Sequence, residues 1–76
     1  MHRIELIARG AKDVDVLLYS PNNLYLAAYS MPHMSPVQAY IYVRGLVALF
    51  GAGIDSNSEN AWNYCIRMYQ DEGMKN

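Results

Sequence analysis

The hydrophobic pattern divides the chain into a first half with a period of two residues and a second half with a longer period. Apolar positions alternate with polar or aromatic ones in residues 3–9, 14–20 and 24–31, and such alternation predicts half-buried β-strands. The core-facing positions of these stretches are Ile4, Leu6, Ala8, Val14, Val16, Leu18, Leu24, Leu26 and Ala28. Short turns join the stretches, so we expect an antiparallel meander of three strands.

The turn between the second and third stretches determines how they pair. Ser20-Pro21-Asn22-Asn23 suits a type I turn, in which proline presets the backbone and asparagine tolerates the left-handed conformation. A loop of three residues, 21–23, keeps the apolar faces together, whereas a two-residue loop would mix them. The three-residue loop predicts the pairs Tyr19 with Tyr25, Ser20 with Leu24, Leu18 with Leu26, Val16 with Ala28, and Asp15 with Tyr29.

Residues 36–50 are predicted to form a helix that is apolar on nearly every side. Ser35 and Gln38 make a capping box at its start, and Gly51 can take the left-handed conformation after its end. Arg44 is the one charged residue within it. A helix with so little polar surface is normally covered on two sides, by the sheet and by a second helix or a second subunit.

Residues 57–72 are predicted to form a second helix, with a clear division between polar and apolar sides. It follows a second capping box, at Ser56 and Glu59, and stops before Gly73. Its apolar stripe consists of Ala61, Trp62, Cys65, Ile66, Met68 and Tyr69. We therefore expect one α+β domain, residues 1–76, in which a small antiparallel sheet carries two C-terminal helices on one face.

Composition and motifs argue against an enzyme. The six basic and seven acidic residues are scattered along the chain and give a net charge of −1, so the sequence has no basic stripe for nucleic acid. Cys65 lies on an apolar stripe, where we expect a buried and unreactive thiol. The two histidines and the single cysteine do not form a four-ligand zinc pattern. We therefore expect no catalytic residue, no cofactor and no metal.

No stretch of the sequence is typical of a membrane segment. The longest uncharged apolar run, residues 46–54, is far shorter than the roughly 20 residues that span a bilayer. Charged residues interrupt the apolar stretch at the N-terminus, which is unlike a signal peptide. We expect a soluble protein of the cytoplasm.

The feature that indicates a function is a group of tyrosines on the sheet face that the helices leave open. Tyrosine offers a large contact area with a polar tip, and a contiguous exposed patch of this kind marks an interface. We expect a partner protein there, with a homodimer contact or a purely structural pairing of tyrosines as alternatives. The residues expected to contact the partner are Arg3, Glu5, Asp15, Leu17, Tyr19, Tyr25 and Tyr29.

The order of elements, "GAG" at residues 51–53 and a final helix that opens with "SENAWN" resemble the small phage-encoded anti-CRISPR proteins of the type I-F class. The resemblance covers residues 51–72. It implies a non-enzymatic inhibitor in the host cytoplasm, which docks its sheet face on a subunit of a crRNA-guided surveillance complex and blocks target DNA. No contact residue can be carried over from that class. A homo-oligomeric structural or regulatory protein, self-associating through the sheet face or the first helix, is the alternative.

Overall fold

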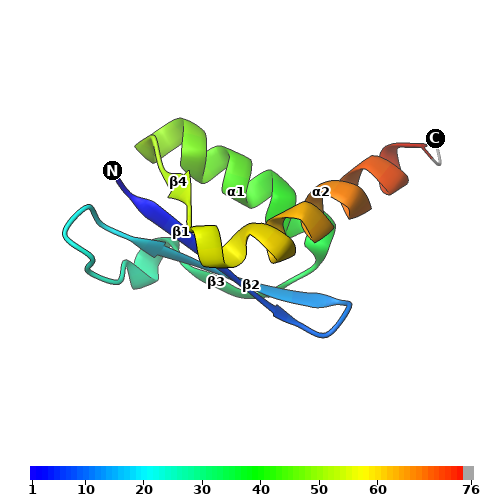
Figure 1. The fold of residues 1–76 in the computed structure, drawn as a ribbon, viewed down its shortest axis with the longest axis horizontal. Helices are drawn as coiled ribbons and strands as arrows, with labels where there is room; N and C mark the ends of the chain where they lie inside the picture. The colour runs from blue at the N-terminus through cyan, green and yellow to red at the C-terminus, as the bar shows by residue number, and fades with distance from the viewer. Residues whose placement is uncertain (75–76) are drawn as a thin grey trace.

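The computed structural model describes residues 1–74 and shows an α+β fold (Figure 1). Its elements are β1 (Arg3–Arg9), β2 (Asp13–Tyr19), the 3₁₀ helix η1 (Ala27–Tyr29), β3 (Met31–Met34), α1 (Pro36–Phe50), β4 (Gly53–Ile54), the 3₁₀ helix η2 (Ser56–Ser58) and α2 (Glu59–Met74). The strands form one sheet in the order β3-β2-β1-β4. Both helices lie on the same side of this sheet, as the sequence predicts (Figure 1).

The core lies between the sheet and the two helices. Alternate side chains of β1 and β2 point toward the helices, and this alternation follows from the pleat of the strands. The buried apolar residues are Ile4, Leu6, Val14, Val16, Leu18, Ala39, Val43, Leu46, Ala52 and Cys65. In β1 and β2 these positions confirm the predicted core face, except that Ala8, near the tip of the β1–β2 hairpin, is exposed.

The third strand predicted at residues 24–31 is wrong. Tyr25 makes a single bridge to Tyr19, and the chain then turns through η1 before it rejoins the sheet as β3. A serine hydroxyl makes this detour possible, because Ser30 Oγ accepts the N–H of Leu18 (3.0 Å). The Leu18 N–H, which would otherwise need a backbone carbonyl of a neighbouring strand, therefore keeps a hydrogen-bond partner. As a result Val16 lies opposite Met31, and the expected partner Ala28 is exposed in η1.

Strand β4 is absent from the prediction. Its two residues, Gly53 and Ile54, pair in parallel with Arg3 and Ile4 at the start of β1. They make the sheet mixed, where a purely antiparallel sheet was expected. A strand of two residues is too short to show any alternation, so the hydrophobic pattern carries no sign of it.

Helix α1 begins and ends at the predicted residues. The Ser35 hydroxyl accepts the N–H of Gln38 (3.2 Å), and Gly51 takes the left-handed conformation with φ 63°. The sheet and α2 cover one side of this helix, while Ile41 and Leu49 on its other side are 56% and 70% exposed. The sheet and a second helix therefore both contact α1, as expected, but residues 1–74 leave its outer side uncovered.

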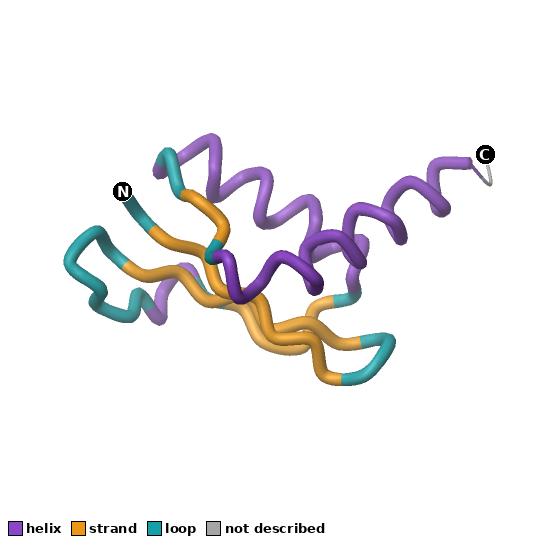
Figure 2. Tube along the Cα trace, in the orientation of Figure 1, coloured by secondary structure: helices purple, strands orange, loops and turns teal. Residues whose placement is uncertain are grey.

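Helix α2 begins at Glu59, two residues later than predicted, because Ser56–Ser58 form η2. Its stripe packs on α1, where Tyr40 stacks between Trp62 (5.2 Å between ring centroids) and Tyr69 (4.3 Å). The helix starts beside β1 and rises away from the sheet toward its C-terminus (Figure 2). The tip of the β1–β2 hairpin therefore projects below α2 (Figure 2).

Candidate protein-interaction face

The side of the sheet away from the helices carries the candidate site (Figure 1). Odd-numbered residues of β1 and β2 point to this side, because the even-numbered ones fill the core. We call this surface the open face and define it by Arg3, Glu5, Ile7, Arg9, Asp15, Leu17, Tyr19 and Tyr25. Six of the residues predicted to contact a partner belong to it; Tyr29 does not.

Tyr19 and Tyr25 form the aromatic centre of the open face. Their ring centroids lie 5.7 Å apart with the planes tilted by 54°, which is within the range of favourable aromatic pairs. Tyr25 remains 53% exposed, so it is accessible to a partner. The bridge between these two residues confirms the predicted opposition of Tyr19 and Tyr25.

The turn before Tyr25 has the predicted geometry. Asn23 adopts the left-handed conformation with φ 70°, and its N–H donates to the Ser20 carbonyl (2.8 Å). The N–H of Ser20 donates to the Leu24 carbonyl (2.9 Å), so the three-residue loop is confirmed. Leu24 itself was expected in the core but is 62% exposed.

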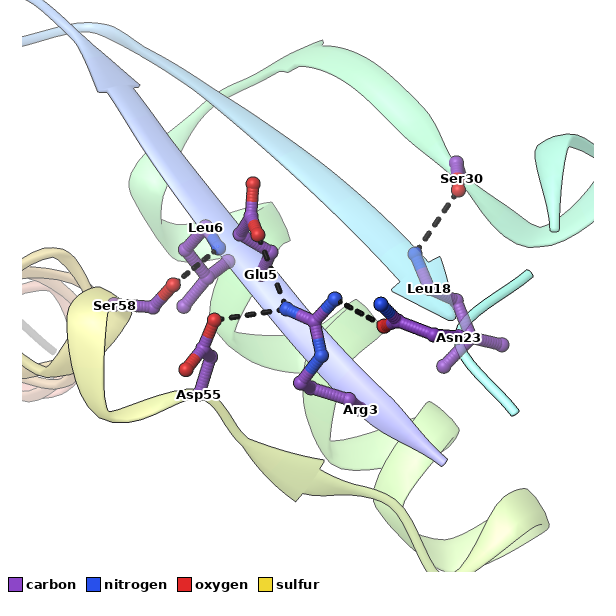
Figure 3. A network of polar contacts seen from close by, with 8 residues as sticks. All are labelled: Arg3, Glu5, Leu6, Leu18, Asn23, Ser30, Asp55 and Ser58. Atoms are coloured by element: carbon purple, nitrogen blue, oxygen red, sulfur yellow. Dashed lines mark hydrogen bonds and ion pairs between the residues drawn. The ribbon is translucent and has the colours of Figure 1, made fainter. Parts of the chain in front are cut away.

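Arg3 ties the aromatic pair to the rest of the molecule. Figure 3 shows the hydrogen bonds of its guanidinium group to Glu5, Asn23 and Asp55. Its guanidinium carbon lies 4.3 Å from the centroid of the Tyr19 ring, a cation–π contact. Its Nη1 donates to Asp55 (2.8 Å) and to Glu5 (3.1 Å), and its Nη2 donates to Asn23 (2.7 Å). Arg3 thereby joins β1, the tyrosine-bearing turn and the segment after β4, and it fixes the position of the Tyr19 ring.

Asp15 sits at the other end of the open face. Its carboxylate accepts the backbone N–H of His33 (2.9 Å) and pairs with the Nε of Arg9 (2.5 Å). The His33 bond, followed by the Arg9 bond, lowers the pKa of the Asp15 carboxyl below its ordinary value of 3.8. Asp15 was expected opposite Tyr29; it anchors β3 instead, at the irregularity of the β2–β3 pairing.

The depressed pKa of Asp15 predicts a loss of stability in acid. The folded state favours the deprotonated carboxyl, so this contribution is present above pH 3.8 and is lost as the pH falls through the folded-state pKa. We expect the free energy of unfolding to fall more steeply in the native protein than in Asp15→Asn between about pH 4 and pH 2. Urea denaturation across this range measures the difference.

Asp71→Asn is the matched control for this experiment, because it removes one exposed carboxylate on α2 that makes no ion pair within residues 1–74. Asp71→Asn is expected to keep the acid slope of the native protein. An acid slope in Asp15→Asn as steep as that of the native protein would contradict the role given to Asp15.

A hollow of about 140 Å³ lies beside the aromatic pair on the open face. Its apolar lining includes Ile7, Leu17, Tyr25, Met31 and Pro32. Leu17, which was predicted to contact a partner, is half-buried in this lining. The open face therefore combines an aromatic ridge with an adjacent apolar depression, the arrangement in which an anchoring side chain of another protein is held.

Tyr29 leaves the predicted group of tyrosines. Its ring packs edge-on against Phe50 at the end of α1, with 4.9 Å between centroids. Its backbone carbonyl accepts the hydroxyl of Tyr42 (2.7 Å), which further ties it to α1. The helical turn of η1 breaks the alternation that would have placed Tyr29 beside Tyr25, so the tyrosines serve two different surfaces.

Arg9, Asn23 and Asp55 were not among the predicted site residues, although each holds a member of the open face in place. Arg9 lies on the same face of β1 as Glu5 and Ile7, because the three residues are spaced two apart. The two-residue period of the strand could therefore have identified it. Asn23 follows from the turn chemistry. Asp55 could not be found from the sequence, because it reaches Arg3 only through the unpredicted strand β4.

Residues 1–74 contain no group of histidine, cysteine and acidic side chains that could hold a metal ion. Cys65 is fully buried, and desolvation raises the pKa of its thiol. No helix within residues 1–74 is long and apolar enough to cross a membrane.

Comparisons with known proteins do not assign the chain to a family. No family model, curated protein or solved structure matches it. The resemblance of residues 51–72 to type I-F anti-CRISPR proteins therefore stays a prediction, and the functional argument rests on the open face.

Proposed function

We propose that this chain is a small non-enzymatic interaction module that binds a partner protein through the open face. The observation that carries this proposal is the fixed arrangement of Tyr25, Tyr19 and Arg3 on a sheet surface without cover from residues 1–74. Aromatic and arginine side chains dominate binding energy at protein interfaces. Because the Arg3 network already holds the Tyr19 ring, little side-chain freedom is lost on binding.

The more specific proposal is a phage anti-CRISPR inhibitor. It combines the resemblance of residues 51–72 with the open face, and it identifies the partner as a subunit of a crRNA-guided surveillance complex in the host cytoplasm. Inhibition would be steric: a chain of 8.6 kDa docked on the complex would occupy the path of the target DNA.

A DNA-binding assay tests the inhibitor proposal. A purified type I-F surveillance complex is incubated with the protein and then with a fluorescent target duplex, and bound DNA is measured by gel shift. We expect near-complete loss of DNA binding at stoichiometric protein, together with co-elution of protein and complex on gel filtration. Unchanged DNA binding without co-elution would reject this partner, and co-elution with unchanged DNA binding would reject steric inhibition.

Self-association is the second candidate, and the outer side of α1 favours it. Ile41 and Leu49 are exposed there, and Arg44 is the one charged residue of the helix. Exposed apolar side chains in a continuous helix commonly mark an interface with another subunit. Light scattering during gel filtration separates the candidates: a monomer of 8.6 kDa favours a partner protein, and a particle of twice that mass favours self-association.

A further inference from the structure

The outer edge of β1, on the side away from β2, is covered only along its first half. The N–H of Asp55 donates to the Ile4 carbonyl (2.8 Å) at the end of β4. The Ser58 hydroxyl then accepts the N–H of Leu6 (2.8 Å), as Figure 3 shows. Strand β4 and then the buried Ser58 therefore supply hydrogen-bond partners to the backbone groups of this edge as far as the Leu6 N–H.

Beyond that point the edge is free of partners from residues 1–74. Backbone groups of alternate residues point to the same side of a strand, so the groups of Ala8 point outward like those of Ile4 and Leu6. Within residues 1–74, no hydrogen bond reaches the Leu6 carbonyl, the Ala8 N–H or the Ala8 carbonyl along this edge. A row of unpaired strand groups is a template for another extended backbone.

A groove lies beside this unpaired edge. It has a volume of about 570 Å³, because α2 rises away from the sheet while the β1–β2 hairpin continues below it (Figure 2). The Tyr64 hydroxyl donates to the Ala11 carbonyl (2.8 Å) and links the hairpin tip to α2. The groove is lined by Leu6, Ile7, Ala8, Gly10, Ala11, Asn57, Asn60, Ala61 and Tyr64.

The lining specifies the chemistry of an occupant. It contains no charged side chain, and small residues such as Ala8, Ala11 and Ala61 leave room for another chain. The amides of Asn57 and Asn60 both donate and accept hydrogen bonds, as main-chain amides do. An uncharged, extended segment therefore fits the groove, whereas a charged one would lose hydration without gaining a partner.

The opposite edge of the sheet differs. Strand β3 contains Pro32, which lacks an N–H, and His33, whose φ of 57° interrupts an extended backbone. Proline and local irregularity are the usual features that prevent edge-to-edge pairing. The second half of β1 has neither of them. The edge at β3 is therefore protected against pairing with another strand, and the edge at β1 is not.

We propose that the edge from Leu6 to Ala8 accepts an extended, uncharged segment of a partner protein as an added β-strand. The backbone of that segment bonds to the free groups of Leu6 and Ala8, and its side chains on one face enter the groove below α2. This site shares only Ile7 with the open face, and it stands whether or not the inhibitor proposal holds.

A terminally blocked peptide of alternating serine and valine is the probe, observed by NMR with the ¹⁵N-labelled protein. In the free protein, the amide of Ala8 should exchange rapidly, while the amide of Leu6 is protected by Ser58. We expect the peptide to shift the resonances of residues 6–8 and 57–64 and to slow the exchange of the Ala8 amide. The same peptide, N-methylated at alternate residues, should produce neither effect.

Two variants test the position of the peptide. Asn60→Trp fills the groove from the exposed side of α2, and we expect at least about tenfold weaker peptide binding. Asn63→Trp is the matched control, because Asn63 is exposed on the same helix and does not line the groove. Ala8→Pro removes the outward N–H without removing a bond to β2, and it should also weaken binding.

Several results would overturn the proposal. They are the absence of shifts at millimolar peptide, shifts confined to residues of the open face other than Ile7, or equal binding by Asn60→Trp and Asn63→Trp. Protection of the Ala8 amide that rises with protein concentration alone would assign the edge to a second copy of the chain. That result would reject a partner segment as the occupant.

Discussion

Replacing Tyr19 and Tyr25 together by alanine is expected to abolish partner binding while leaving the protein folded. Aromatic anchors at the centre of an interface contribute about 2 kcal/mol or more each, which is about thirtyfold in Kd per residue. Since their effects are not additive, we expect a combined loss of at least about a hundredfold. Isothermal titration against the partner subunit measures the loss.

The cost in stability should be much smaller than the cost in binding. Tyr25 is 53% exposed, and the two rings contribute about 0.5–1.5 kcal/mol to each other through their contact. Urea denaturation should therefore show a folded variant with a slightly lower midpoint. Complete unfolding would show that the tyrosine pair is structural and not a binding site.

Ile41→Ala with Leu49→Ala is the matched control for the tyrosine variant. It also removes two large, exposed apolar side chains, but from the outer side of α1. We expect full partner binding from this control. Lost binding here, with binding intact in the tyrosine variant, would move the interface from the open face to α1.

Ser58→Ala is expected to destabilise the protein strongly for so small a change. Ser58 is 1% exposed, and its hydroxyl is the acceptor for the Leu6 N–H in a buried position. Leaving a buried donor without a partner costs about 1–3 kcal/mol. In a domain of this size each kcal/mol lowers the Tm by about 4–8 °C, which thermal unfolding followed by circular dichroism resolves.

Ser56→Ala provides the comparison for Ser58→Ala. Ser56 is exposed in the same 3₁₀ helix, and its side chain makes no hydrogen bond to the described residues. Its Tm should stay close to that of the native protein. Equal effects from the two substitutions would mean that the Leu6–Ser58 bond contributes nothing specific to stability.

Local patterns in the sequence predict most of the fold, and the reason is visible in the turn after β2. Proline and asparagine at residues 21–23 determine the loop, and the loop determines that Tyr19 lies opposite Tyr25. The same is true of α1, whose limits are set by Ser35 and Gly51. In both cases the signal lies within a few residues of the structure that it specifies.

The features that the sequence does not reveal depend on residues far apart in the chain. The Ser30 hydroxyl accepts the Leu18 N–H in place of a backbone carbonyl from a neighbouring strand. Residues 27–29 can therefore form η1, which carries Tyr29 away from the open face and toward Phe50. Asp55 reaches Arg3 only after β4 has joined β1. A single hydrogen bond from a serine hydroxyl leaves no repeating pattern of hydrophobic and polar residues, so the hydrophobic pattern does not reveal it.

The pairing of β4 with β1 also bears on the order in which the protein folds. Arg3 and Asp55, joined across this pairing, lie 52 positions apart, whereas the β1–β2 hairpin is closed by a short local turn. Closing a long loop is slow relative to forming a local hairpin, so the hairpin should form first. During synthesis the whole outer edge of β1 is then bare until residues 53–58 arrive, and this interval is when the nascent chain is most exposed to aggregation.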